Sequence, residues 1–260
     1  MNYSYLLFFT IISTLILMYL VSKYAFSNGK PHCKHFVTNV YLYLALSFSL
    51  VGCSIHMYNY FLNKKSDVSK LISLNQTLKQ ITPYIILSFI ISIISIILLA
   101  VQPIFSKEGF MRNHIIWLLF ILSISLSLYP YFKSIEYFEV LNKALVITSL
   151  IFLLMSYVAV QYSSFFNRTY KLAIIGMLVA LVAIIITELC LLFTQKYTYN
   201  LFTIISYIVI ILFSIFIAYD TSRLFHYADI CVHSPNYPQL SSHLFLDILN
   251  IFVRLMGTSR

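Results

Sequence analysis

The chain has 260 residues, of which 60% are hydrophobic and only 10% are charged. A soluble domain carries about 25% charged residues, so this composition excludes a separate soluble domain. The 17 Lys and Arg residues outnumber the 8 Asp and Glu residues. They are spread thinly along the chain, which favours contacts with anionic lipids and argues against nucleic-acid binding.

Apolar segments recur along the whole chain, and runs of about 20 apolar residues are typical of transmembrane helices. Eight such segments are predicted: Tyr5–Phe26, Phe36–Leu62, Ile81–Ile104, Ile115–Phe132, Ala144–Tyr162, Leu172–Phe193, Leu201–Leu224 and Leu244–Met256. The short connections between them favour a bundle of antiparallel neighbours. The sequence therefore predicts an all-α polytopic membrane protein in contact with the lipid bilayer.

The first segment, Tyr5–Phe26, has the position of a cleaved signal peptide. However, Met1–Tyr5 carries no Lys or Arg, and the apolar stretch is longer than the 7–15 residues of a signal-peptide core. We expect this segment to be retained as a membrane span.

The orientation of the bundle in the membrane is predicted from the distribution of its Lys and Arg residues. These residues divide almost evenly between the two sides. If the last segment is re-entrant, the side that carries the connection Lys23–His35 has a small excess of them. Because positive charge favours the cytosolic side, this excess places Lys23–His35 in the cytosol.

The four cysteines do not suggest a cross-linked scaffold. Cys53 and Cys190 lie in apolar segments, whereas Cys33 and Cys231 lie in connections, and no CxxC spacing occurs. We therefore expect neither a disulfide framework nor a zinc site.

Two acidic residues stand out near the C-terminus. Asp220 ends the uncharged run Tyr199–Tyr219, and Asp247 lies inside Leu244–Met256. A carboxylate at bilayer depth costs about 2.5–3.5 kcal/mol on insertion scales, so such residues are usually functional. The segment Leu244–Met256 is too short for a lipid-exposed span, and we expect it to be buried among other helices, extended at its polar ends, or re-entrant.

A polar stripe follows the last segment, because His243, Asp247, Asn250 and Arg254 are spaced i, i+4, i+7 and i+11 and so share one helical face. All other residues between them are apolar, which predicts that the stripe faces other helices or a wet cavity. Glu188, late in its span, is a third candidate acid. The predicted ion path or pH gate comprises Asp220, Asp247, Asn250, Arg254 and Glu188.

Two interpretations of the acids are open. Close carboxylates in apolar surroundings cannot both ionise cheaply, so they would share a proton and act as a pH-dependent latch. Alternatively, Asp220 pairs with Arg223 at the membrane interface, and Asp247 contacts Arg254 or Asn250 as part of helix packing. An intramembrane aspartyl protease would need a glycine-rich motif that is absent around Asp247, and we expect no enzymatic activity.

Three stretches of the chain resemble the Bax inhibitor family of transmembrane proteins. Phe216–Thr221 contains Tyr-Asp-Thr, as at the end of that family's sixth helix, and Leu244–Phe252 follows its last-helix pattern. Ala144–Ser149, with Ser156 and Tyr157 after it, is similar to the start of its fourth helix. The resemblance covers about residues 36–257.

The resemblance implies a core of seven helices at residues 36–257, with a short and central last helix. An extra transmembrane segment at residues 1–30 precedes this core. Asp220 and Asp247 would then gate a pH-regulated, passive leak of calcium from the endoplasmic reticulum or Golgi, and the leak would inhibit apoptosis. Calcium would be the permeating ion, with no cofactor.

The alternative is a non-conducting membrane protein that binds apoptotic regulators or calcium channels. Family members include virus-encoded proteins, and the Ile-, Tyr-, Asn- and Lys-rich composition is typical of an AT-rich genome, which is consistent with a viral source.

Overall fold

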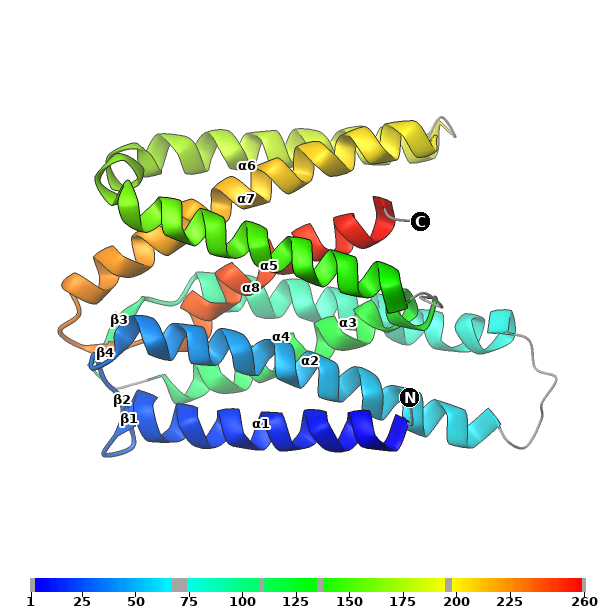
Figure 1. The fold of residues 1–260 in the computed structure, drawn as a ribbon, viewed down its shortest axis with the longest axis horizontal. Helices are drawn as coiled ribbons and strands as arrows, with labels where there is room; N and C mark the ends of the chain where they lie inside the picture. Colours follow the sequence, from blue (N-terminus) through cyan, green and yellow to red (C-terminus); the bar gives the residue numbers. More distant parts are fainter. Residues whose placement is uncertain (1–2, 67–73, 108–109, 135–137, 195–197, 259–260) are drawn as a thin grey trace. The chain divides into compact units, whose positions relative to one another are not determined.

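The computed structural model describes residues 3–66, 74–107, 110–134, 138–194 and 198–258. The described helices are α1 (Tyr3–Ala25), α2 (Phe36–Ser66), α3 (Leu74–Ala100), α4 (Met111–Ser134), α5 (Phe138–Gln161), α6 (Ser163–Phe193), α7 (Tyr199–Asp229) and α8 (Tyr237–Thr258). All eight are long and apolar enough to cross a membrane. The prediction of an all-α polytopic membrane protein is confirmed (Figure 1).

The described strands are pairs of residues in the connections. They are β1 (Phe26–Ser27), β2 (Lys30–Pro31), β3 (Phe105–Ser106) and β4 (Ser234–Pro235), paired as β1–β2 and β3–β4. Asn28 and Gly29 connect β1 to β2 with φ values of 52° and 75°. Two successive residues with positive φ make the tight turn that Asn-Gly favours, so α1 is joined to α2 through a short hairpin.

The chain forms two compact units. The first comprises Met1–Glu136 with Cys231–Ser242, and the second comprises Tyr137–Ile230 with His243–Arg260. These units reflect packing, so the boundary expected between residues 1–30 and 36–257 stays a prediction.

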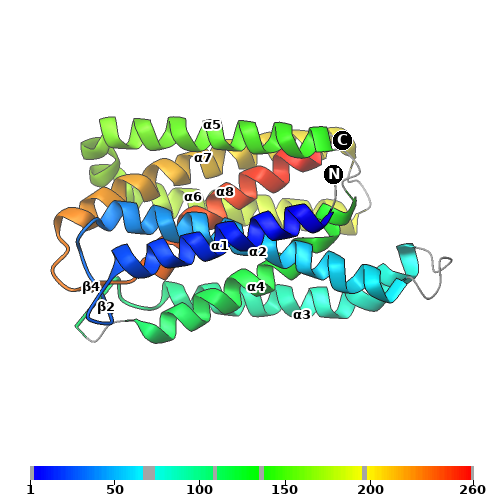
Figure 2. The same ribbon diagram turned by 60° about the horizontal axis from the view of Figure 1, so that its bottom comes forward.

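In the first unit, α1 packs on α2 and α3 packs on α4, as both ribbon views show (Figures 1 and 2). Hydroxyl groups join the helices of each pair. Thr14 Oγ1 lies 2.8 Å from Ser49 Oγ, and Ser88 Oγ lies 2.9 Å from Ser127 Oγ. Such hydrogen bonds stabilise helix pairs in a membrane, where apolar burial alone does not favour protein over lipid.

The start of α8 is anchored to α2 inside the first unit. The Tyr237 ring stacks on the Tyr43 ring with centroids 5.7 Å apart, and Asn39 Nδ2 donates to Tyr237 Oη over 3.1 Å. Tyr43 Oη in turn lies 2.6 Å from His114 Nε2 on α4. All four side chains except His114 are almost completely buried, so these contacts fix the position of the first turn of α8.

The last helix is longer than the predicted segment Leu244–Met256, because it begins at Tyr237 and has 22 residues. The segment is therefore extended at its polar ends, which was one of the alternatives for it, and the short last helix that the family resemblance implies is longer than expected. The polar residues that interrupt the apolar pattern are buried and hydrogen-bonded: Asn236 Oδ1 caps the helix by accepting from the Gln239 N–H over 3.3 Å, and Gln239 Nε2 donates to Ala100 O. A capped first turn lets the helix start before its apolar run.

The expectation of no disulfide is also wrong, because Cys33 and Cys231 are bonded to each other. They lie 198 residues apart in sequence, with Cα atoms separated by 5.8 Å, a normal span for a disulfide. A search for local Cys spacings cannot detect a pair that is brought together only by folding. Cys53 and Cys190 are free thiols.

In the second unit, α7 packs against both α5 and α6. The Phe166 ring on α6 meets the Tyr219 ring on α7 edge-on, with centroids 4.9 Å apart. Only 6% of the α6 span is buried, against 61% of α8. The apolar surface of α6 therefore faces lipid, whereas α8 is surrounded by protein.

Candidate ion site on α7 and α8

Asp220 lies on a part of α7 that is hydrogen-bonded to its neighbours. The residues on either side of it all bond to α5 or to the start of α6. These contacts are Tyr219 Oη to Thr169 Oγ1 (2.8 Å), Thr221 Oγ1 to Ser156 Oγ (3.5 Å) and Ser222 Oγ to Asn167 Oδ1 (3.3 Å). Ser156 and Thr221 both belong to the stretches that carry the family resemblance. The half-buried Asp220 side chain is thus held on a well-fixed segment of backbone.

Arg223, one turn after Asp220, is held between two tyrosines. Its guanidinium carbon lies 4.5 Å from the centroid of the Tyr170 ring and 4.9 Å from that of Tyr227, and its Nη1 donates to Tyr170 Oη. Stacking on both aromatic faces stabilises a cation in apolar surroundings. This clamp fixes a positive charge whose field reaches Asp220.

Asp247 lies on α8 with only 7% of its surface exposed. The charges of Asp220 and Asp247 interact with each other, and His243 also interacts with Asp220. Asp247 Oδ2 is buried and has no hydrogen-bond partner among the described residues. A buried carboxylate oxygen without a partner is costly, which calls for a proton or a cation at this position.

Asn250 continues the polar stripe of α8 one turn after Asp247. Its Nδ2 donates to Leu246 O over 2.8 Å within the same helix. The alternative in which Asn250 bonds the Asp247 carboxylate does not match this geometry. Because the amide nitrogen is turned to the backbone, the amide oxygen is the group of Asn250 that can contact a cation.

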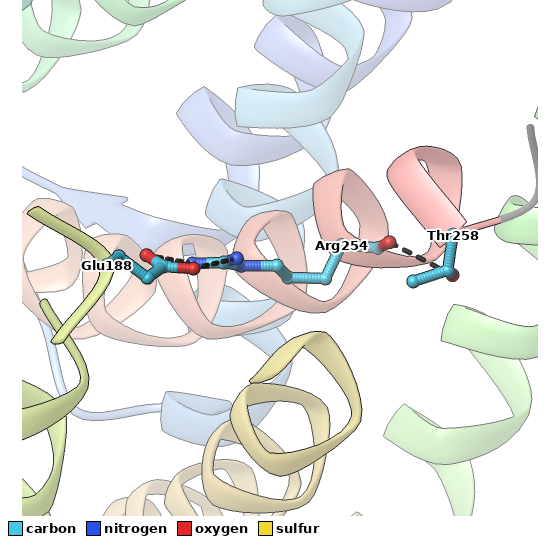
Figure 3. Close-up of polar contacts among 3 residues, drawn as sticks. All are labelled: Glu188, Arg254 and Thr258. Atoms are coloured by element: carbon cyan, nitrogen blue, oxygen red, sulfur yellow. Dashed lines mark hydrogen bonds and ion pairs between the residues drawn. The ribbon is translucent and has the colours of Figure 1, made fainter. Parts of the chain in front are cut away.

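Arg254, two turns after Asp247, forms a bidentate ion pair with Glu188 on α6. Nη1 lies 2.5 Å from Oε1 and Nη2 lies 2.9 Å from Oε2 (Figure 3). The side chains are only 21% and 17% exposed, so the two charges neutralise each other in a largely water-free place. Arg254 is thus paired with Glu188, and the predicted pairing with Asp247 is not what the structure has.

The end of α8 also approaches the start of α7. Tyr199 Oη donates to Thr258 O over 3.2 Å, and an added Cβ at Gly257 would lie 2.7 Å from Phe202 Cζ. The absence of a side chain at Gly257 allows this close approach. It places Arg254, in the preceding turn of α8, beside the Phe202 ring.

The five predicted residues therefore fall into two groups in the second unit. Asp220 and Asp247 form an acidic pair between α7 and α8, whereas Glu188 and Arg254 form an ion pair between α6 and α8, with Asn250 between the groups on α8. A comparison with protein families identifies the chain: the model of the family described as "Inhibitor of apoptosis-promoting Bax1" matches residues 33–258. The chain belongs to the Bax inhibitor family.

This Bax inhibitor family protein is an integral, multi-pass membrane protein. Comparison with individual curated proteins gives no significant match. The family match begins at residue 33, after the end of α1 at Ala25.

The aromatic clamp on Arg223 was not predicted from the sequence. Tyr219, Arg223 and Tyr227 are spaced i, i+4 and i+8, so they share a face of α7, and an Arg flanked by tyrosines in an apolar helix is a detectable signal. The contribution of Tyr170 from α6 could not be detected, because it depends on how the two helices pack.

Proposed function

We propose that this member of the Bax inhibitor family is a pH-regulated, passive calcium leak of the endoplasmic reticulum or Golgi membrane, and that the leak inhibits apoptosis. The observation that supports the proposal is the acidic pair Asp220 and Asp247, whose charges interact while Asp247 Oδ2 is buried without a hydrogen-bond partner among the described residues. The protein performs no enzymatic reaction and needs no cofactor.

The pH dependence comes from the proton that the two carboxyl groups share. With the proton present, the pair carries one negative charge and holds α7 and α8 together. When the proton leaves, two like charges face each other in apolar surroundings, where their repulsion is poorly screened. The repulsion is relieved if the helices separate or if a cation binds between the carboxylates. Leak therefore rises with pH.

Calcium suits this site because it is a hard cation that prefers carboxylate and amide oxygens. Asp220 and Asp247 supply carboxylates, and Asn250 supplies an amide oxygen on the same face of α8 as Asp247. A univalent cation would neutralise only one of the two charges. The doubly ionised pair thus favours a divalent ion.

Arg254, paired with Glu188, is the next polar residue after Asn250 on the polar face of α8. Arg254 follows Asp247 by seven residues, a rise of about 10 Å along the helix. While Arg254 is bonded to Glu188, a fixed positive charge stands on the path and opposes cation passage. We assign Glu188 and Arg254 the role of a second barrier.

Calcium content of internal stores tests the proposal in cells. Expression of the wild-type protein is expected to lower the stored calcium and the fraction of cells that die after an apoptotic stimulus. The variant with Asp220→Asn and Asp247→Asn should do neither, while Asp229→Asn, which changes an exposed acid at the end of α7, should behave as wild type.

The same experiment distinguishes the calcium leak from the alternative of a non-conducting membrane protein. If the double Asn variant leaves stored calcium unchanged but still protects cells, the acids are packing residues. The protein would then act by binding apoptotic regulators or calcium channels.

A further inference from the structure

The Cys33–Cys231 disulfide joins two connections that lie far apart in sequence. Cys33 follows the β1–β2 hairpin, which ends at Pro31, and Cys231 lies two residues after the end of α7. Neither cysteine falls inside a candidate membrane span. Both are therefore at the edge of the membrane, where soluble redox proteins can reach them.

Non-covalent contacts hold the same two connections together. Tyr237 Oη donates to His32 O over 2.5 Å, and the Phe36 and Tyr237 rings lie 5.6 Å apart. β2 and β4 are also in contact. The cysteines are thus brought together by the fold of the first unit, and the bond is not required to create the contact.

The surroundings of the disulfide favour thiol–disulfide exchange. Both cysteines are partly exposed, and their neighbours Lys34 and His233 are exposed. A nearby cationic side chain stabilises the thiolate, which is the species that attacks a disulfide. The site is therefore open to an oxidoreductase from one side of the membrane.

We propose that Cys33 and Cys231 are a thiol–disulfide exchange site on the non-cytosolic side of the membrane, and that their bond is a reducible tether between the α1–α2 hairpin and the start of α8. In forming the bond, the two thiols lose two protons and two electrons in total, and the electrons reduce a protein disulfide of the oxidising compartment to its dithiol. Disulfides of this kind persist in oxidising compartments and are rare in the cytosol.

The proposal reverses the orientation expected from charge. The count of Lys and Arg gave only a small excess on the side of Lys23–His35, and it treated the last segment as re-entrant. α8 is long and apolar enough to cross the membrane, and the excess is lost when α8 is counted as a span. The chemistry of the disulfide then decides the side.

The tether also matters for α8. Cys231 precedes Asp247 by 16 residues, and the loop that the bond closes contains α2 to α7. Reduction would leave the first turn of α8 held by non-covalent contacts alone, among them those of Tyr237 with Tyr43 and Asn39. This inference does not depend on the proposed calcium leak.

Differential thiol labelling tests the bond in a variant with Cys53→Ser and Cys190→Ser, which keeps only Cys33 and Cys231. Free thiols are first blocked with N-ethylmaleimide, and the protein is then denatured, reduced and treated with a polyethylene-glycol maleimide. We expect a monomer whose band shifts by two labels only when reduction precedes labelling. Adding Cys33→Ser or Cys231→Ser should abolish the shift. No shift after reduction would mean that both thiols were free and had been blocked in the first step, and it would overturn the tether, as would a disulfide-linked dimer on a non-reducing gel.

Sidedness is tested with a membrane-impermeant phosphine reductant on the same variant. We expect the disulfide to survive when only the plasma membrane is permeabilised, and to be reduced when internal membranes are opened as well. Reduction after permeabilising the plasma membrane alone would place the bond in the cytosol and overturn the assignment. The deciding result of each assay is measured on the unbroken pair, and only the control variants lack the bond.

Discussion

Replacing both Asp220 and Asp247 with Asn is expected to remove the pH dependence of calcium leak. Asn has nearly the shape of Asp but does not titrate, so the pair can neither share a proton nor acquire a second charge. In proteoliposomes with a calcium-sensitive dye inside, wild-type leak should rise about tenfold as the shared proton is lost, which corresponds to about 1.4 kcal/mol between the two protonation states. The double variant should leak at one low rate at every pH.

Asp229→Asn is the matched control, because Asp229 is an exposed aspartate on the same helix as Asp220. It should keep both the rate and the pH profile of the wild type. A double variant that still follows the wild-type profile would show that other groups regulate the leak.

Breaking the Glu188–Arg254 pair is expected to have the largest effect on stability. Glu188→Gln leaves the Arg254 guanidinium without its counter-charge in a place where the side chain is 21% exposed. Removing one partner of a buried ion pair costs about 3–5 kcal/mol, and we expect the lower end, about 3 kcal/mol, because some exposure remains. Unfolding in mixed micelles with increasing sodium dodecyl sulfate measures the change.

The double variant with Glu188→Gln and Arg254→Gln should recover most of that loss, because no charge is then left unpaired. The pair Glu139 and Lys143 on α5 is the control: it is also an ion pair, but its side chains are 78% and 63% exposed. Glu139→Gln should therefore leave stability unchanged. Equal losses from Glu188→Gln and Glu139→Gln would contradict the role of burial.

The rate of calcium leak tests the role of Glu188 and Arg254 in function. Arg254→Gln removes the positive charge that opposes cations and leaves Glu188 to attract them, so it should increase the leak. Glu188→Gln should decrease it, because Arg254 then stands on the path without its partner. An unchanged leak in both variants would remove Glu188 and Arg254 from the path while leaving the acidic pair as the gate.

Much of the fold follows from composition alone. Helices of about 20 apolar residues are the simplest way to satisfy backbone polar groups in lipid, so the eight spans could be predicted within a few residues of their cores. The functional interest of Asp220 and Asp247 was also predictable, because each interrupts an apolar run where a carboxylate is costly.

The start of α8 could not be predicted by the same reasoning. Gln239, Ser241 and Ser242 look like loop residues, yet they are buried in the helix. The Ser241 and Ser242 hydroxyls bond to the Pro238 carbonyl within the helix, whereas the bond from Gln239 to Ala100 O exists only after the first unit has folded. Hydrophobic periodicity therefore placed the beginning of the helix too late.

Long-range pairs were the other failure. Glu188 and Arg254 were both candidates, but their bond depends on the end of α6 meeting the end of α8. Cys33 and Cys231 were judged by local spacing, although 198 residues separate them. In each case the residue type marked the position as a candidate, but the sequence did not reveal which residue it bonds to. The bonding partner is determined by tertiary packing.

Infrared spectroscopy on protein with isotope-labelled aspartate tests the acidic pair most directly. Only a protonated carboxyl group gives the carbonyl stretching band of an acid, and the label assigns that band to aspartate. We predict this band in the wild-type protein and in Asp229→Asn at neutral pH, and its loss in the double variant with Asp220→Asn and Asp247→Asn. If the wild-type protein lacks the band at neutral pH, both carboxyl groups are ionised, no proton is shared, and the proposed gate is contradicted.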